Sequence, residues 1–210
     1  MMDSQIGDPT IARTGWSPHR TTRAAPPPGI LIVPGIRGSG STHWQSDWAR
    51  TVPGAERLEQ GDWDRPRLSN WTAALVEALR RRPGAVVVAH SLGCALVAHY
   101  ARISGGRNIA AALLVAPADV DGGDAWLGDH NSFAPMPRER FGFPSLVAAS
   151  RNDPYVSLGR AHGFAEAWGA EFRDLGRVGH VNVDSGHGPW PDGLTLLDGL
   201  LGRVAGLRAG

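Results

Sequence analysis

The sequence predicts an α/β fold, with a mostly parallel central sheet flanked by helices on both faces. Short apolar runs alternate along the chain with stretches of helical periodicity, and this alternation is typical of βαβ units. The 210 residues are enough to bury the core of one such sheet and too few for two independent ones. We therefore expect a single domain over residues 29–210, with no large lid domain.

Five short runs are the expected strands. Each is bounded by Gly, Pro or polar residues, and most are apolar enough to be covered on both faces. They are Ile30–Val33, Ala85–Ala89, Ile109–Ala116, Ser145–Ala149 and, with a weaker pattern, Glu171–Leu175.

Three helices are expected to cover this sheet, because their apolar residues recur three or four positions apart. The first contains Trp71, Leu75 and Leu79 after a cap at Ser69 or Asn70. The second begins after the cap Ser157, runs through Phe164 and Trp168, and ends at Gly169. The third, near the C-terminus, contains Leu194, Leu197, Leu201 and Val204.

The remaining segments are expected to be irregular. Residues 1–28 end in three consecutive prolines and show no periodicity, so we expect a disordered tail that buries too little surface to offset its ordering entropy. Residues 119–143 carry Gly, Asp and Pro without a sustained period and are expected to form a long loop over the strand ends. Trp126 and Phe133 in this loop are candidates for the wall of a substrate pocket.

Composition excludes several classes of protein. The net charge of +1 provides no field for nucleic acid or an anionic membrane. Cys94 is the single cysteine, so a disulfide framework and a cysteine zinc cluster are excluded. Met1–Pro28 has no apolar core of a signal peptide, and no run of about 18 apolar residues occurs. We expect a cytoplasmic protein.

The segment Ala89-His90-Ser91-Leu92-Gly93 resembles a G-x-S-x-G nucleophile elbow with alanine at its first position. An apolar strand precedes it and an apolar helix follows, which is the context that such an elbow requires. The tight turn needs small residues two positions before and after the serine, and it lifts the serine hydroxyl above the sheet. Ser91 is therefore the candidate nucleophile, and the alternative is a plain helix cap.

A serine nucleophile needs a base, and the base needs an acid that orients it. In α/β-hydrolases the chain order is Ser, acid, His. Asp153 follows the expected strand Ser145–Ala149, where the acid belongs. His180 and His187 both come later on glycine-flanked loops, and we favour His180 because it follows the last strand more closely. The alternative acids are Asp119, Asp121 and Asp124.

Backbone amides are the expected oxyanion donors. The amide of Leu92 opens the helix after the elbow, and the loop Pro34–Gly40 after the first strand provides the second amide, at Ile36. The glycines of this loop do not form G-x-G-x-x-G, and the sequence contains no lysine for a Walker loop, so nucleotide binding is not expected. The mechanism requires neither a metal nor an organic cofactor.

Several spaced motifs resemble the YdeN and retinoblastoma-binding protein 9 family of small serine hydrolases. They are Val33-Pro34-Gly35, Gly38-Ser39-Gly40, His43-Trp44-Gln45-Ser46-Asp47-Trp48, Ala89–Gly93, Gly179-His180-Val181-Asn182 and Gly188-Pro189-Trp190-Pro191. The resemblance covers nearly all of the chain beyond residue 28. It implies a compact α/β-hydrolase without a large lid, and a triad of Ser91, Asp153 and His180. The pair Trp44 and Trp48 resembles a feature of this family. On a helix, these two side chains would either pack in the core or form a pocket wall.

The resulting hypothesis is a serine hydrolase that cleaves small acyl esters through an acyl-enzyme. An amidase or an acyltransferase would use the same three residues. A protein-interaction module is the alternative from another class. The family name suggests that such a module would bind through a Leu-x-Cys-x-Glu motif. This motif is absent, because Leu92-Gly93-Cys94-Ala95-Leu96 lacks the acidic residue. A non-catalytic ligand-binding protein is disfavoured because all three members of the triad are present.

Overall fold

The computed structural model describes residues 28–122 and 131–209. The expected tail up to residue 27 and the pocket candidate Trp126 lie outside the described residues. The described part contains one sheet of six strands, all paired in parallel in the order β2-β1-β3-β4-β5-β6. The strands are β1 (Ile30–Val33), β2 (Ala55–Arg57), β3 (Ala85–His90), β4 (Ile109–Val115), β5 (Ser145–Ala149) and β6 (Glu171–Asp174). The predicted α/β class is confirmed.

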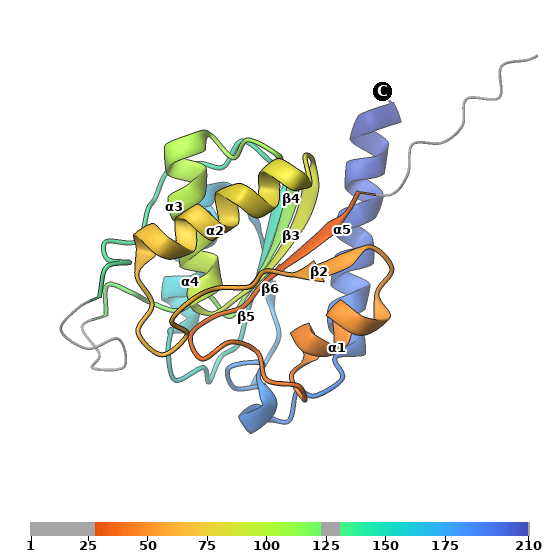
Figure 1. Cartoon of the computed structure of the whole chain (residues 1–210). Coiled ribbons are helices and arrows are strands. Elements are labelled where there is room, and N and C mark those ends of the chain that lie inside the picture. The colour runs from red at the N-terminus through yellow and green to blue at the C-terminus, as the bar shows by residue number, and fades with distance from the viewer. Residues whose placement is uncertain (1–27, 123–130, 210) are drawn as a thin grey trace, which may run out of the picture.

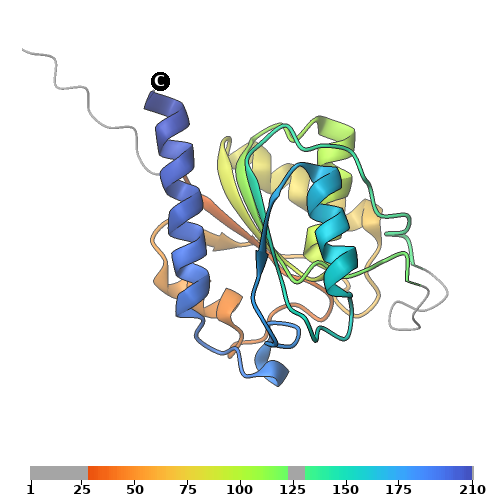
Figure 2. The ribbon, with the colours of Figure 1, turned by 180° about the vertical axis from the view of Figure 1, so that it is seen from behind.

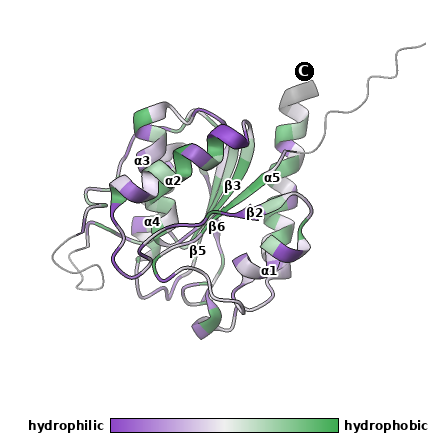
Figure 3. Ribbon diagram, viewed as in Figure 1, coloured by the Kyte–Doolittle hydropathy of each residue, from purple (hydrophilic) through white to green (hydrophobic). Residues whose placement is uncertain are grey.

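Helices cover both faces of this sheet (Figures 1 and 2). On one face lie α2 (Leu68–Arg81), α3 (Leu92–Ser104) and α4 (Leu158–Trp168), and on the other lie α1 (Trp44–Thr51) and α5 (Pro191–Ala209). Side chains alternate along each strand, so Val87 of β3 packs in the first layer while Val86 packs in the second. Figure 3 shows the apolar strands enclosed between helices that carry polar residues on their outer faces. Burial on both faces explains the continuous apolar runs.

Two elements differ from the prediction: one strand was not predicted, and one helix begins earlier than expected. Strand β2 was missed because Ala55-Glu56-Arg57 is a half-buried edge strand without an apolar run. Helix α2 begins at Leu68, before the expected caps, and its N-cap residue makes no side-chain cap bond. Instead, the Leu68 amide donates to Ser132 Oγ at 2.9 Å. A side chain from a distant loop therefore caps this helix, which local sequence does not reveal.

The second expected helix is confirmed at both ends. Ser157 Oγ accepts a hydrogen bond from the Arg160 amide at 3.2 Å, as an N-cap should. Gly169 ends α4 with φ 67°, a left-handed conformation that glycine adopts at little cost.

The connection between β4 and β5 contains no helix or strand in its described residues. Phe133 and Phe141 of this connection are buried in the core beside α3 and α4, so the described part of the segment packs against the sheet layer and forms no large lid. No helix in the described ranges is long and apolar enough to cross a membrane.

The topology places a crevice between the ends of β1 and β3. From β1 the chain passes to β2 on one side, whereas β3, β4, β5 and β6 extend the sheet on the other. In open α/β sheets such a switch point is where ligands bind.

Candidate active site

Ser91 lies at this switch point, in the turn that joins β3 to α3. Its backbone has φ 55° and ψ −123°, a strained conformation for a residue with a side chain. A Cβ added to Gly93 would lie 2.5 Å from the carbonyl oxygen of Val33, so the turn can pass this close to β1 only with glycine at that position. These are the strain and the small residue that the elbow motif predicts.

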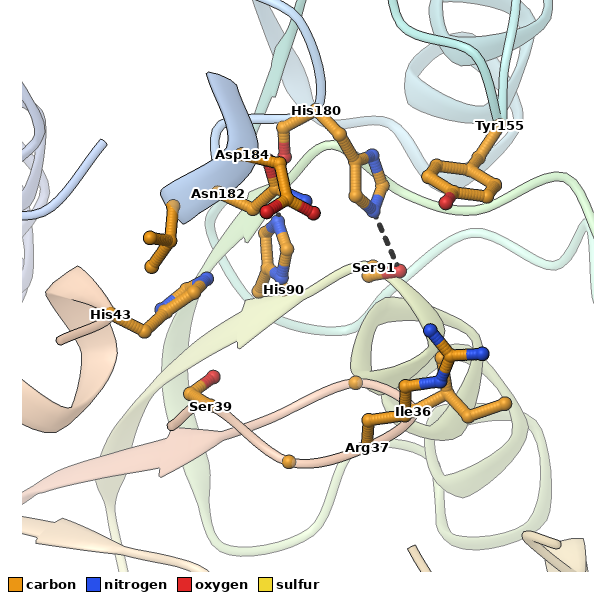
Figure 4. Close-up of a pocket in the computed structure, with 13 residues that line it drawn as sticks. Ile36, Arg37, Ser39, His43, His90, Ser91, Tyr155, His180, Asn182 and Asp184 are labelled. Carbon is orange, nitrogen blue, oxygen red and sulfur yellow. Dashed lines mark hydrogen bonds between the residues drawn. The ribbon is translucent and has the colours of Figure 1, made fainter. Parts of the chain in front are cut away.

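A line of hydrogen bonds joins Ser91, His180 and Asp153. Figure 4 shows the bond between His180 and Ser91. His180 Nε2 lies 2.9 Å from Ser91 Oγ. His180 Nδ1 lies 2.9 and 2.8 Å from the two oxygens of Asp153, whose side chain is fully buried. Because an ionised carboxylate only accepts hydrogen bonds, Nδ1 carries the proton and Nε2 is free to accept the serine hydroxyl proton. This arrangement can activate a serine as a nucleophile.

The alternatives considered from the sequence lie elsewhere. His187 contacts Ser185 Oγ at 3.4 Å and does not line the pocket that contains Ser91. Asp119 is engaged by Arg160 through two contacts of 2.6 Å, and Asp121 also contacts Arg160. Asp124 lies outside the described residues.

The loops that carry Asp153 and His180 are tied to each other by side chains that the sequence analysis missed. Ser150 Oγ accepts from the Val178 amide at 3.0 Å and donates to the Gly176 carbonyl at 3.2 Å. Asn152 Oδ1 accepts from the Gly179 amide at 2.9 Å. These bonds fix the acid and the imidazole relative to one another. Their partners are 26 to 28 positions apart in the chain, so sequence offers no signal for them.

The two candidate oxyanion amides come from adjoining backbone segments. A Cβ added to Gly35 would lie 2.8 Å from Ser91 Cβ and 3.2 Å from the nitrogen of Leu92. Glycine at this position therefore allows the loop of Ile36 to lie directly against the start of α3. Ile36 lines the pocket with Ser91.

A pocket of about 250 Å³ opens over Ser91. The pocket candidates Trp44 and Phe133 do not line it, and both side chains are fully buried in the core. Its wall is formed instead by the loop after β1, by the residues around His180, by the end of β3 with Ser91, and by single residues before α1 and after β5. The lining residues are Gly35, Ile36, Arg37, Gly38, Ser39, His43, His90, Ser91, Tyr155, His180, Asn182, Val183 and Asp184.

Trp44 is hydrogen-bonded to the loop that carries His180. Its indole Nε1 donates to the carbonyl oxygen of Val181 at 2.8 Å, directly after His180. Val181 is fully buried and has φ 50°, which is a strained conformation for a β-branched residue. The tryptophan therefore holds the loop of His180 in a conformation that the loop would not adopt readily by itself.

Gln45 bridges β1 and β3 at the switch point. Its Nε2 donates to the carbonyl oxygens of Val33 in β1 and Val88 in β3, at 3.3 and 3.2 Å. Its Oε1 accepts from Ser39 Oγ at 2.6 Å. The fully buried amide thus connects both strands with the loop that carries Ile36.

Two further imidazoles flank His180. His90 Nε2 lies 2.8 Å from the carbonyl oxygen of His180, so this nitrogen is the donor. Burial, together with the nearby His180 and His43, lowers the pKa of His90 well below its usual value. Burial is also the largest cause that lowers the pKa of His43 to about 4, and His180 adds to it. Both side chains are neutral near pH 7.

The described part of the chain contains no cluster of residues that could bind a metal ion. No group of three or more His, Cys, Asp or Glu side chains there is placed to hold an ion.

Comparison with known families gives a direct match. The model of the serine hydrolase family matches residues 30–199, which includes the elbow and both loops of the hydrogen-bonded line. The chain belongs to this serine hydrolase family. It is therefore a hydrolase of the α/β class, and the predicted resemblance to YdeN is confirmed by its structural neighbours.

Among solved structures, a YdeN-like hydrolase from Pectobacterium atrosepticum is 32% identical, with a TM-score of 0.73, over 84% of this chain and 91% of that one. The ydeN gene product of B. subtilis is 21% identical, with a TM-score of 0.64, over 83% and 99% of the two chains. A thermophilic esterase from Thermogutta terrifontis is 12% identical, with a TM-score of 0.59, over 85% and 90%, and shares the fold alone. The comparison with curated proteins found no match.

Proposed function

We propose that this serine hydrolase cleaves small acyl esters, with Ser91 as nucleophile, His180 as base and Asp153 as the acid that orients it. The observation that supports this proposal is the hydrogen-bonded line from Ser91 Oγ through the imidazole to the buried carboxylate. The line begins on a strained elbow inside a pocket. Such strain persists at sites where the surrounding structure maintains it for function.

In the first half of the reaction, His180 Nε2 takes the hydroxyl proton of Ser91 as Oγ attacks the acyl carbonyl. Asp153 stabilises the imidazolium, and the amides of Leu92 and Ile36 bind the oxyanion. The imidazolium then gives its proton to the alkoxide that leaves, and an acyl-enzyme remains. Water repeats the cycle, with His180 again as base, and releases the carboxylic acid and the free serine.

The test compares the wild type with Ser91→Ala on short-chain p-nitrophenyl esters and with a fluorophosphonate probe. Turnover and labelling should both be present in the wild type and absent from the variant. A folded wild type that neither labels nor turns over would contradict the proposal and favour a binding protein. Hydrolysis of amides faster than of matched esters would contradict the ester assignment while leaving the nucleophile in place.

A further inference from the structure

His43 is a pocket residue with no role in the proposed mechanism. It is the N-cap of α1, and its Nδ1 accepts a hydrogen bond from the Gln45 amide at 3.1 Å. Its side chain lines the pocket that contains Ser91, although the residue is only 6% exposed. Figure 4 shows its imidazole extending from the start of α1 toward His90.

The cap determines which nitrogen of His43 carries the proton. An amide N–H can be accepted only by an unprotonated nitrogen, so Nδ1 is bare and the neutral ring carries its proton on Nε2. The pKa of about 4 keeps the ring in this neutral form near pH 7. The structure therefore presents an uncharged N–H donor of fixed orientation.

This donor has no partner. His43 Nε2 is buried and makes no hydrogen bond within the described residues. Five other described side-chain atoms are buried without a partner, but none of their residues lines this pocket. They are Arg57 Nε, both amide atoms of Gln60, His99 Nδ1 and Ser145 Oγ. A buried donor without an acceptor is costly. His43 lines the pocket, so a substrate oxygen that displaces the atoms covering Nε2 would provide the missing acceptor.

The surroundings indicate which acceptor fits. In the view of Figure 4, His43, His90 and Asp184 lie on one side of Ser91, and Tyr155 lies on the other. Asp184 lines the same pocket and would repel a carboxylate or a phosphate there. The cation of the pocket, Arg37, extends toward the opposite side of Ser91 from His43 in this view. A neutral imidazole also brings no charge to pair with an anion. An uncharged oxygen meets neither penalty.

We propose that His43 Nε2–H binds an uncharged oxygen of the substrate, namely a carbonyl, ether or hydroxyl oxygen on the arm of the ester that extends from Ser91 past His90. The inference rests on the proposed ester hydrolysis at Ser91. It narrows the substrates to esters that carry a further uncharged oxygen besides the two of the ester group. His43 is then a specificity-determining residue that distinguishes such esters from plain alkyl esters of the same size.

The test uses esters that differ only in one oxygen in place of a methylene. For the acyl arm, the pairs are p-nitrophenyl methoxyacetate with butanoate, and p-nitrophenyl 3-methoxypropanoate with pentanoate. For the alcohol arm, 2-methoxyethyl butanoate is compared with butyl butanoate by pH-stat titration. The variant is His43→Asn, because asparagine is a good N-cap whose oxygen can still accept from the Gln45 amide, while the Nε2 donor is lost. His187→Asn is the matched control, since His187 lies near the site but outside the pocket wall.

In at least one pair, His43→Asn should lower kcat/KM for the methoxy ester by about 5- to 10-fold, the size expected for one neutral hydrogen bond, and for its methylene partner by less than about twofold. Each ester is compared with itself between enzymes, so intrinsic reactivity cancels. His187→Asn should leave both values unchanged. Equal losses for both members of every pair would overturn the inference and make His43 a structural cap. If the wild type hydrolyses no ester, or Ser91→Ala is as fast as the wild type, the proposed function itself fails.

Discussion

A fall in pH from about 8 to about 5 should destabilise the folded chain, because buried imidazoles beside Ser91 resist protonation. The pKa of His43 falls from 6.5 in the unfolded chain to about 4 in the folded one. Between these two values the unfolded state binds more protons than the folded state. The free energy of unfolding therefore rises with pH over this window. The contribution of the neutral His43 to stability is lost as the pH decreases through it.

The size of this effect follows from the difference between the two pKa values. For a pKa of 6.5 unfolded and about 4 folded, linkage gives a loss of about 2 kcal/mol at pH 5, which approaches about 3 kcal/mol below pH 4. The pKa of His90 is lowered in the same direction, so it adds to the loss.

Urea unfolding followed by circular dichroism at several pH values measures this contribution. The wild type should lose about 2 kcal/mol more stability than His43→Asn over the same change to pH 5, because that variant keeps the helix cap but has no imidazole to protonate. Groups that His43 does not influence cancel in the comparison, and the pKa of His90 remains lowered in the variant because burial is its largest cause. Parallel pH profiles for the two proteins would refute the burial argument for His43.

Three further predictions concern the site. Asp153→Asn should lower kcat on an aryl ester by about 10³–10⁴-fold with an unchanged melting temperature; a loss below about tenfold would show that another group orients His180. Gly35→Ala should displace the Ile36 amide, because its Cβ would lie 2.8 Å from Ser91 Cβ, and lower kcat by about 10²-fold in steady-state assays; retention of full activity would remove this loop from the oxyanion site. Trp44→Phe should lose the bond to the Val181 carbonyl and about 1 kcal/mol of stability in urea unfolding; an unchanged unfolding midpoint would mean that this bond is not needed to hold the loop.

Patterns that repeat along the chain were sufficient to predict the elements of the core. Strands such as Ala85–His90 are buried on both faces, so they appear as unbroken apolar runs. The edge strand Ala55–Arg57 could not be found in this way, because its half-buried face imposes no apolar pattern. The start of α2 was missed for a related reason, since its capping group comes from Ser132, 64 residues away.

For the site, the sequence alone determined the features that depend on neighbouring residues and on the order of the strands. A tight strand-to-helix turn needs small residues around Ser91, and the order of strands along the chain placed Asp153 and His180 at loops beside it. Only the tertiary structure decided which side chains surround them. It placed Trp44, for which core packing and a pocket wall were both open, in the core with a hydrogen bond to the His180 loop, and it placed His43 in the pocket wall. A helical or strand period shows whether a side chain is buried, but contact between distant segments depends on how the helices and loops pack over the sheet, which no local pattern records.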